Sequence, residues 1–162
     1  HWMFIANSIL EDEKAGLDKT AEVMMRLGVA MADAFIGCWN AKYQYDLVRP
    51  VTYIKKVIDP KWEPLLITPP FPEYPSGHST QSGAAAAVLA SIFGEAYAFI
   101  DRTHERDGLG VRNFASFTAA AEEAGISRMY GGIHFRAAIE QGLAQGRCIA
   151  QHTIALRTQS ST

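Results

Sequence analysis

Two cationic side chains and a tryptophan lie close together in the sequence and could bind an anion. Lys42 and Arg49 are separated by about two helical turns near the end of a helical pattern, so both are predicted to project from one face. Trp39 precedes Lys42 by about one turn and makes this face partly apolar. A solvated pair of cations is the simpler interpretation, but a cation beside aromatic side chains usually needs an anionic partner.

The sequence Tyr-Pro-Ser-Gly-His-Ser at residues 74–79 is predicted to begin a helix. Gly77 lets a ligand approach the backbone closely, and the first helical turn offers unpaired N–H groups at the positive end of the helix dipole. Ser76 adds a hydroxyl group, and His78 is placed to exchange protons with a bound ligand. The alternative is an N-cap serine followed by an incidental histidine.

A third segment places Arg128 and His134 on either side of two adjacent glycines. Arg128 is predicted to end one helix and His134 to begin the next, with the glycines forming a sharp turn between them. The planar guanidinium group suits a tetrahedral oxyanion, and His134 would present a ring nitrogen to the same ligand. A histidine near the start of a helix is also commonly structural, and that alternative stays open.

Taken together, three fixed cations, the amides of a helix start and two histidines complement a tetrahedral oxyanion that carries several negative charges. Other ligand-binding patterns are missing from the sequence. It has no His-x-x-x-His or Cys-x-x-Cys pair for a metal, no Gly-x-x-x-x-Gly-Lys loop for nucleotide phosphates and no Cys-x-x-x-x-x-Arg arrangement of a thiol phosphatase. The expected chemistry is therefore at phosphate or a similar oxyanion.

Apolar residues recur every three or four positions along most of the chain, which predicts helices rather than strands. The expected helices span residues 2–14, a second segment capped by Asp18 or Thr20 and ending near 46, and residues 79–99, 113–130 and 134–157. Residues 51–75 are rich in proline and are predicted to form a long ordered loop, and residues 101–110 a polar loop. No strand is predicted. The expected fold is an all-α bundle of about five helices over residues 1–157, with a polar tail at 158–162.

The composition of the 162 residues fits one globular domain, since 48% are apolar, 20% are charged and the net charge is −2. A net charge this small removes the electrostatic case for general nucleic-acid binding. The longest nearly uncharged run, residues 82–94, is too short to cross a bilayer. Cys38 and Cys148 lie in apolar patterns and are predicted to be buried thiols.

The chain begins without methionine and inside an amphipathic pattern, so we expect it to be the C-terminal part of a longer protein. No signal peptide is recognised at its start, and the sequence predicts no compartment; a signal in a preceding segment would imply export. Met24, Met25 and Met31 form a partly apolar face. This face is predicted to pack against a preceding helical region or a second copy of the chain.

The three segments contain the motifs Lys42-x6-Arg49-Pro50, Pro75-Ser76-Gly77-His78 and Ser127-Arg128-x5-His134. In this order they resemble the signature of a superfamily that contains type 2 phosphatidic acid phosphatases, bacterial nonspecific acid phosphatases and vanadium-dependent haloperoxidases. The tryptophan three residues before the lysine and the phenylalanine of Thr-Pro-Pro-Phe-Pro-Glu-Tyr resemble the chloroperoxidase branch. The resemblance implies a helical bundle, in agreement with the apolar periodicity.

The resemblance also implies a vanadate-dependent haloperoxidase, whose partners are hydrogen peroxide and halide. His134 would be the axial ligand of vanadium and His78 the acid–base residue. Lys42 would polarise the peroxide. Trp39 and Phe71 would line a halide pocket. The oxygens of vanadate, or of phosphate at the same site, would be bound by Lys42, Arg49, Ser76, Gly77 and Arg128. The larger relatives pair this last arginine with an acidic residue upstream of where this chain begins.

One position departs from the phosphatase pattern, which places an aspartate four residues after the second histidine, where this chain has Ala138. Such a carboxylate orients the imidazole and makes it more nucleophilic, so its loss weakens the phosphatase interpretation more than the haloperoxidase one. Glu140 is the nearest substitute, and a backbone carbonyl could also orient the ring. Two alternatives stay open: an acid phosphatase for phosphomonoesters with His134 as nucleophile and His78 as acid, and a non-catalytic oxyanion-binding domain.

Overall fold

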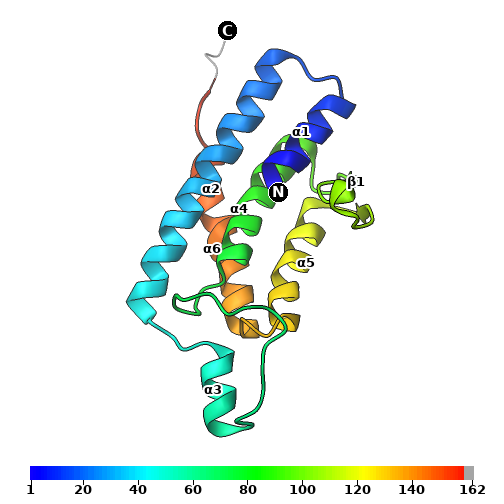
Figure 1. Cartoon of the computed structure of the whole chain (residues 1–162). Helices are drawn as coiled ribbons and strands as arrows, with labels where there is room; N and C mark the ends of the chain where they lie inside the picture. Colours follow the sequence, from blue (N-terminus) through cyan, green and yellow to red (C-terminus); the bar gives the residue numbers. More distant parts are fainter. Residues whose placement is uncertain (159–162) are drawn as a thin grey trace.

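The computed structural model describes residues 1–158 and is mostly helical, which confirms the predicted fold class (Figure 1). A short antiparallel pair of strands, with a 3₁₀ turn at Glu105–Asp107 between them, lies between the fourth and fifth α-helices of the chain. The elements are α1 Trp2–Asp12, α2 Leu17–Tyr45, α3 Pro50–Val57, α4 Gly77–Phe93, β1 Phe99–Asp101, β2 Arg112–Phe114, α5 Phe117–Tyr130 and α6 Arg136–Ile154.

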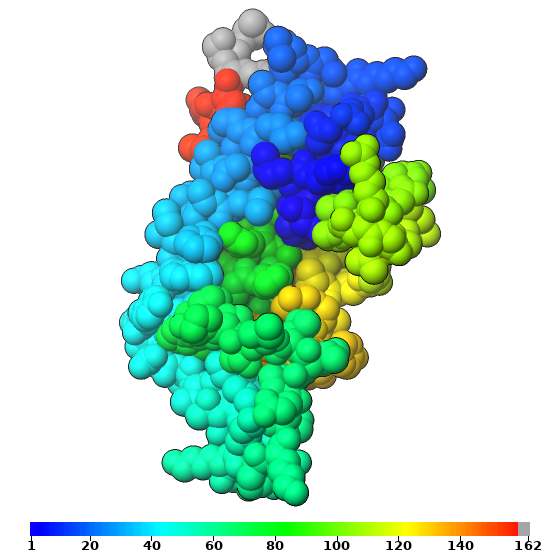
Figure 2. Space-filling view, in the orientation of Figure 1, coloured from blue at the N-terminus to red at the C-terminus, as the bar shows by residue number. Residues whose placement is uncertain are grey.

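The helices α1, α2, α4, α5 and α6 pack together as a bundle, and α3 projects from one end of it (Figure 1). In the space-filling view the segment that contains α3 extends well beyond the bundle (Figure 2). The central helix is α4, which contacts α1, α2, α5 and α6. Its sequence is rich in alanine, glycine and serine, so neighbouring helices can approach it on nearly every side.

The close contact between α4 and α6 depends on glycines in α6. A Cβ atom on Gly146 would lie 2.0 Å from the carbonyl oxygen of Thr80, and one on Gly142 would lie 2.8 Å from the carbonyl oxygen of Ser76. Both distances are shorter than any ordinary contact of a Cβ atom, so only glycine fits there. The start of α4, which carries the second motif, is therefore held directly against α6.

Aromatic side chains fill the end of the bundle next to the small sheet. Phe117, at the start of α5, is fully buried. Its ring centroid lies 5.0 Å from that of Phe99, 5.6 Å from that of Tyr97 and 6.2 Å from that of Phe93. Burial of such rings stabilises the fold by about 1.5–3 kcal/mol per side chain. This cluster lies at the end of α5 opposite Arg128, so it anchors the helix without entering the site.

The prediction of one long loop at residues 51–75 is wrong, because α3 occupies its first part. Pro50 is the first residue of α3, where a proline costs no hydrogen bond and its fixed φ angle favours the helix. The next proline is Pro60, so nothing in the sequence interrupts α3 before it ends at Val57. The ordered loop is thus confined to residues 58–76.

The sequence predicts no strand, and this prediction is also wrong, because the chain forms β1 and β2. Gly94, with a φ angle of 109°, ends α4 after Phe93, earlier than the expected residue 99. Phe99 of β1 then pairs with Phe114 of β2, so residues 99–114 form a hairpin. The polar loop predicted at residues 101–110 is part of this hairpin. The start of α5 is consequently later than expected, and Ser116 caps it by accepting a hydrogen bond from the backbone of Ala119.

Two smaller expectations also need correction. The N-cap of α2 is Gly16, not Asp18 or Thr20. Cys38 is buried as predicted, but Cys148 is exposed on α6. The expected polar tail lies outside the described residues except for Thr158, whose hydroxyl accepts a hydrogen bond from Arg26 and donates one to Glu22. Within residues 1–158, no helix combines the length and apolar character needed to cross a membrane.

Candidate functional site

Lys42 lies in the last turn of α2 and is completely buried. Its Nζ donates hydrogen bonds to the backbone carbonyls of Pro72, Glu73 and Pro75, at 2.9, 3.0 and 2.6 Å. These acceptors satisfy the ammonium inside the protein, while burial lowers the pKa of Lys42 to about 8. Lys42 therefore fixes the loop that leads into α4.

Arg49 does not share a helical face with Lys42, contrary to the prediction from their spacing. Helix α2 ends at Tyr45, Asp46 adopts the left-handed conformation, and Arg49 is the N-cap residue of α3. The turn nevertheless brings Arg49 to the same loop as Lys42, because its Nε donates to the carbonyl of Phe71 at 3.0 Å. The two cations thus converge on the loop from two different helices.

The guanidinium of Arg49 connects this loop to the third motif. Its Nη1 donates to the carbonyl of Ile133 at 2.8 Å and lies 3.2 Å from Nε2 of His134. Its Nη2 is buried and has no hydrogen-bond partner within residues 1–158. Burial lowers the pKa of Arg49, but the group stays charged. An unpaired donor on a buried cation is the feature expected where an anion binds.

The ring of His134 is held by Glu73, a carboxylate that is not among the residues predicted from the sequence. Nδ1 of His134 donates to Oε1 of Glu73 at 2.8 Å, and both side chains are almost fully buried. Glu140, the substitute considered from the sequence, is exposed on α6, and no backbone carbonyl takes this place. The signal for Glu73 was a lone charged residue among prolines and aromatic residues just before the second motif.

This hydrogen bond determines which nitrogen of His134 faces the site. With the proton on Nδ1, Nε2 carries a lone pair and accepts the hydrogen bond from Arg49. Burial lowers the pKa of His134, Glu73 opposes this shift and Arg49 adds to it. The ring is therefore neutral near pH 7, with Nε2 available to bond a ligand in place of Arg49.

Ser76 is the N-cap residue of α4 and is fully buried. Its Oγ accepts a hydrogen bond from the backbone of Ser79, and its own backbone N–H donates to the carbonyl of Ala138 in α6. Gly77 follows, and a Cβ atom there would lie 3.3 Å from the ring of Trp39. The helix start thus lies between the aromatic ring of α2 and the first turn of α6.

His78 and Arg128 form the outer part of the site. Nη1 of Arg128 lies 3.5 Å from Nε2 of His78, and its Nε donates to the hydroxyl of Ser127. The His78 side chain is exposed on one side, but the protein around it and the Arg128 charge lower its pKa to about 4, so the ring is neutral near pH 7. Within the described residues no carboxylate pairs with Arg128. Both side chains line a wide groove between the start of α1, the small sheet and α5.

Aromatic rings cover the cations on the side of α2. Trp39 and Phe71 have ring centroids 5.2 Å apart, and Nζ of Lys42 lies 5.8 Å and 5.3 Å from them. The guanidinium carbon of Arg49 is 5.0 Å from the Phe71 ring. Phe35 stacks on Trp39, with centroids 4.0 Å apart. These rings keep water away from the cations, which strengthens their attraction for an anion.

The predicted residues therefore fall into two groups. The inner group, around the loop at residues 71–76, contains Trp39, Lys42, Arg49, Phe71, Ser76, Gly77 and His134. The outer pair is His78 with Arg128. A neutral imidazole nitrogen beside an unpaired guanidinium donor fits an oxyanion centred on an atom that accepts a nitrogen ligand. Vanadate is such an oxyanion, and the donor set fits it. Among residues 1–158, no cluster of three or more His, Cys, Asp or Glu side chains forms a conventional metal site.

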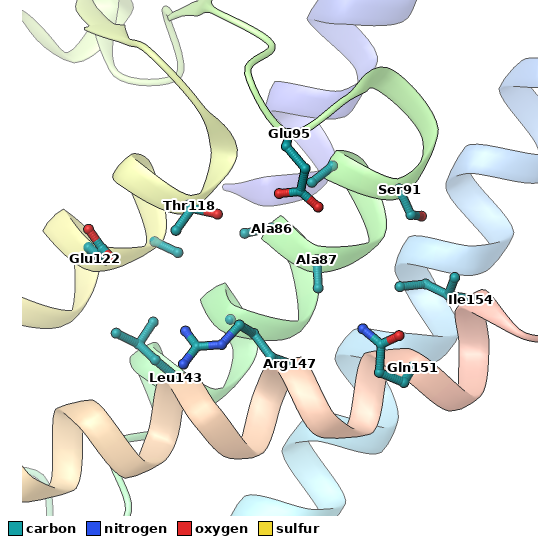
Figure 3. A pocket seen from close by; sticks show the side chains of 13 residues that line it. Ala86, Ala87, Ser91, Glu95, Thr118, Glu122, Leu143, Arg147, Gln151 and Ile154 are labelled. Carbon is teal, nitrogen blue, oxygen red and sulfur yellow. The ribbon is translucent and has the colours of Figure 1, made fainter.

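A second hollow lies between α4, α5 and α6, away from these residues (Figure 3). Alanine side chains of α4 and α5 form part of its floor, and the side chains of Arg147, Glu122 and Glu95 line it. None of the predicted site residues contributes to it. The cations and histidines, not this hollow, define the candidate functional site.

A comparison with protein families matches most of the chain. The family model of the VCPO second helical-bundle domain matches residues 22–161. The chain belongs to this family. The match includes all three motifs and both aromatic residues of the site. A comparison with curated protein sequences found no match.

Solved structures of vanadium-dependent haloperoxidases share the fold. The structure of a bacterial vanadium-dependent iodoperoxidase is 51% identical over 95% of this chain and 38% of that one, with a TM-score of 0.92. Holo and apo structures of a bacterial vanadium-dependent chloroperoxidase are 20% and 19% identical over 93% and 95% of this chain, with TM-scores of 0.69 and 0.72. At this lower identity the likeness is in the fold alone. The chain spans 38–42% of the length of these structures.

Proposed function

We propose that this chain binds vanadate and forms the catalytic part of a haloperoxidase that oxidises halide with hydrogen peroxide. The observation that carries the proposal is the pairing of a neutral His134, whose Nε2 bears a lone pair, with a buried Arg49 that has an unpaired Nη2. Membership in the VCPO second helical-bundle family supports it. Bound vanadate would supply the activation of hydrogen peroxide toward attack by halide.

The residues of this chain would divide the remaining work. Arg49 and Arg128 neutralise the charge of the oxyanion, and His134 presents Nε2 to its central atom. Ser76 and Gly77 bring the backbone N–H groups of the α4 start close to it. Lys42 holds the loop in place and adds a buried positive charge, and Trp39 and Phe71 exclude water on the side where halide would bind.

His78 would act first as a base. Because its pKa is about 4, its ring is neutral at the pH of most cells and can accept a proton from a bound acid. A proton gained there would be returned when water or a hypohalous acid leaves. Its place on the wide groove gives this proton a path to solvent.

Iodide is the halide to test first. The relative that is 51% identical is described as an iodoperoxidase, whereas the chloroperoxidase structures resemble this chain only in fold. Iodide is also the halide most easily oxidised. We therefore propose iodide oxidation, with bromide and chloride as the comparison that measures preference.

Phosphatase chemistry is the second candidate, and one observation favours it. The pair of Glu73 and His134 supplies the carboxylate that Ala138 lacks, so the absence of an aspartate at position 138 no longer weighs against a nucleophilic histidine. This candidate needs a protonated His78 to donate a proton to the leaving group, and the negative charge of a bound phosphate would raise the pKa of His78 from its ligand-free value of about 4.

The experiment measures iodide oxidation by hydrogen peroxide in the intact protein, with and without orthovanadate. We expect turnover only with vanadate, and none in His134→Ala. Hydrolysis of p-nitrophenyl phosphate without vanadate is measured on the same samples. Phosphate release without halide oxidation would favour the phosphatase candidate. Unchanged oxyanion binding in Arg49→Ala would favour a non-catalytic domain.

A further inference from the structure

Glu73 is a buried carboxylate that none of the three motifs contains. Only 2% of its surface is exposed. Its Oε1 accepts two hydrogen bonds, from Nδ1 of His134 at 2.8 Å and from the backbone N–H of Phe135 at 2.9 Å. Burial of a carboxylate is costly unless it is paired in this way. One oxygen atom therefore holds both the ring of His134 and the backbone that follows it.

The backbone of Glu73 is fixed on both sides. Its N–H donates to the carbonyl of Leu47 at 2.9 Å, and its carbonyl accepts from Nζ of Lys42 at 3.0 Å. Lys42 also binds the carbonyls of Pro72 and Pro75. The carboxylate cannot withdraw from His134 without breaking contacts to α2 and to the turn that follows it. Its place is thus set before any ligand binds.

We propose that Glu73 is the positioning residue of His134: it keeps the proton on Nδ1 and aims Nε2 at the oxyanion. The identity of the ligand rests on the proposed function, but the positioning does not. Glu73 lies in the loop 61 residues before His134 and supplies the carboxylate that the phosphatase pattern places at position 138.

Arg49 makes this choice of tautomer matter. If the proton moved to Nε2, two donors would face one another at the 3.2 Å separation between Arg49 Nη1 and His134 Nε2. Glu73 Oε1 would then face a lone pair on Nδ1 instead of an N–H group. Without Glu73 the ring is free to rotate or to change tautomer, and the nitrogen that binds the ligand is no longer presented.

The first measurement is the tautomer of His134 in the intact protein without oxyanion, read from long-range ¹H–¹⁵N NMR spectra. In Glu73→Gln the amide oxygen still accepts both hydrogen bonds, so we expect the Nδ1–H tautomer to persist. In Glu73→Asp the carboxylate is one methylene shorter, and in Glu73→Met no strong acceptor remains. We expect both of these variants to lose the single Nδ1–H form.

Orthovanadate affinity, measured by vanadium NMR titration, should follow the tautomer and not the charge at position 73. We expect Glu73→Gln to stay within about threefold of the wild type and Glu73→Asp and Glu73→Met to bind roughly 10- to 100-fold more weakly. Glu140→Gln, at an exposed carboxylate on α6, is the matched control and should leave both readouts unchanged.

Two results would overturn the proposal. One is a wild-type tautomer and affinity in Glu73→Asp or Glu73→Met, and the other is an equal loss in Glu73→Gln and Glu73→Asp. If Glu73→Met does not fold, the tautomer and the orthovanadate affinity of Glu73→Gln are compared with those of Glu73→Asp, and this comparison tests the proposal. A wild type that binds no vanadate would contradict the proposed function, while the NMR measurement would still test the role of Glu73.

Discussion

Nη1 of Arg49 lies 3.2 Å from Nε2 of His134, although the two residues are 85 positions apart in the chain. Arg49 lies after the turn that ends α2, and His134 lies in the turn before α6. Their side chains can meet because both bind the loop at residues 71–76, Arg49 through Phe71 and His134 through Glu73. The contact places a permanent cation beside the lone pair of a neutral imidazole. An anion that bonds to Nε2 of His134 would therefore also lie within reach of the Arg49 guanidinium.

Replacing Arg49 by lysine should weaken oxyanion binding even though the charge is kept. One ammonium group cannot bond Phe71, Ile133 and an oxyanion together in the geometry of the guanidinium. Hydrogen bonds to a charged group contribute about 1.5–3 kcal/mol, so we expect orthovanadate or phosphate to bind about 10- to 100-fold more weakly in Arg49→Lys. Arg147→Lys, on the exposed side of α6, is the control. Equal affinity in Arg49→Lys and the wild type would contradict the proposal that the Arg49 guanidinium binds the oxyanion.

The titration of His78 tests the electrostatics of the outer pair. We expect its NMR titration to have a midpoint near pH 4, because the surrounding protein and Arg128 disfavour the charged ring. In Arg128→Gln the midpoint should move up, since the repelling charge is gone. Bound phosphate should also move it up in the wild type. A wild-type midpoint near the ordinary histidine value of about 6.5 would contradict this prediction.

The same shift has a consequence for stability. The pKa of His78 is lower in the folded protein than the ordinary value of about 6.5, so the unfolded chain binds more protons between about pH 6.5 and pH 4. Folding stability should therefore fall as the pH decreases through this range. Replacing His78 by asparagine should reduce that fall, which is measurable as the pH dependence of the urea midpoint. An unchanged pH dependence in His78→Asn would show that other groups cause it.

Part of this site could be read from the sequence and part could not. The residue types and spacing around Lys42, Arg49 and His134 predict an oxyanion-binding site, because fixed cations near the start of a helix favour the binding of an anion. The shared helical face predicted for Lys42 and Arg49 was wrong, since the spacing of two turns assumed one uninterrupted helix. The structure instead ends α2 at Tyr45, in the turn where Asp46 is left-handed.

The local sequence singles out Glu73 as a lone charged residue, but it cannot pair Glu73 with His134, which is 61 residues away. The strands β1 and β2 are not predicted for another reason, because three residues each are too few to show an alternating apolar pattern. The helix α3 was missed for a different reason. The high proline content of residues 51–75 predicts a loop, but all of these prolines fall at Pro60 or later and leave residues 51–57 free to form a helix. Periodicity, in contrast, was enough to predict the bundle, since it reports burial along each long helix.

The turn between α5 and α6 should depend on Gly132. Its φ angle is 76°, and a Cβ atom would lie 3.0 Å from both the Pro64 side chain and the Trp62 ring. The left-handed conformation alone costs a residue with a side chain about 1–2 kcal/mol. Gly108 has a φ angle of 80° and no neighbour within 4 Å. Gly108→Ala therefore measures the cost of the left-handed conformation without a steric clash. We expect Gly132→Ala to destabilise the protein more than Gly108→Ala and to weaken phosphate binding, which Gly108→Ala should not do.

The contact between α4 and α6 gives a sharper comparison of two glycines. A Cβ atom on Gly146 would lie 2.0 Å from the carbonyl oxygen of Thr80 and 2.7 Å from the backbone nitrogen of Ala84, so the helices must separate to admit it. Overpacking of this kind costs about 1–3 kcal/mol or more, which exceeds the gain of about 1 kcal/mol in helix propensity. Gly28, on α2, has no neighbour within 4 Å, so Gly28→Ala should show that gain alone.

Urea denaturation would measure both effects. We expect the free energy of unfolding to fall in Gly146→Ala and to rise by up to about 1 kcal/mol in Gly28→Ala. Because Thr80 lies one turn after Ser76 and donates its hydroxyl to the Ser76 carbonyl, separation of the helices also displaces the start of α4. Phosphate affinity should therefore fall in Gly146→Ala and not in Gly28→Ala. A stable Gly146→Ala protein with wild-type affinity would mean that α4 and α6 are not packed as closely as the structure has them.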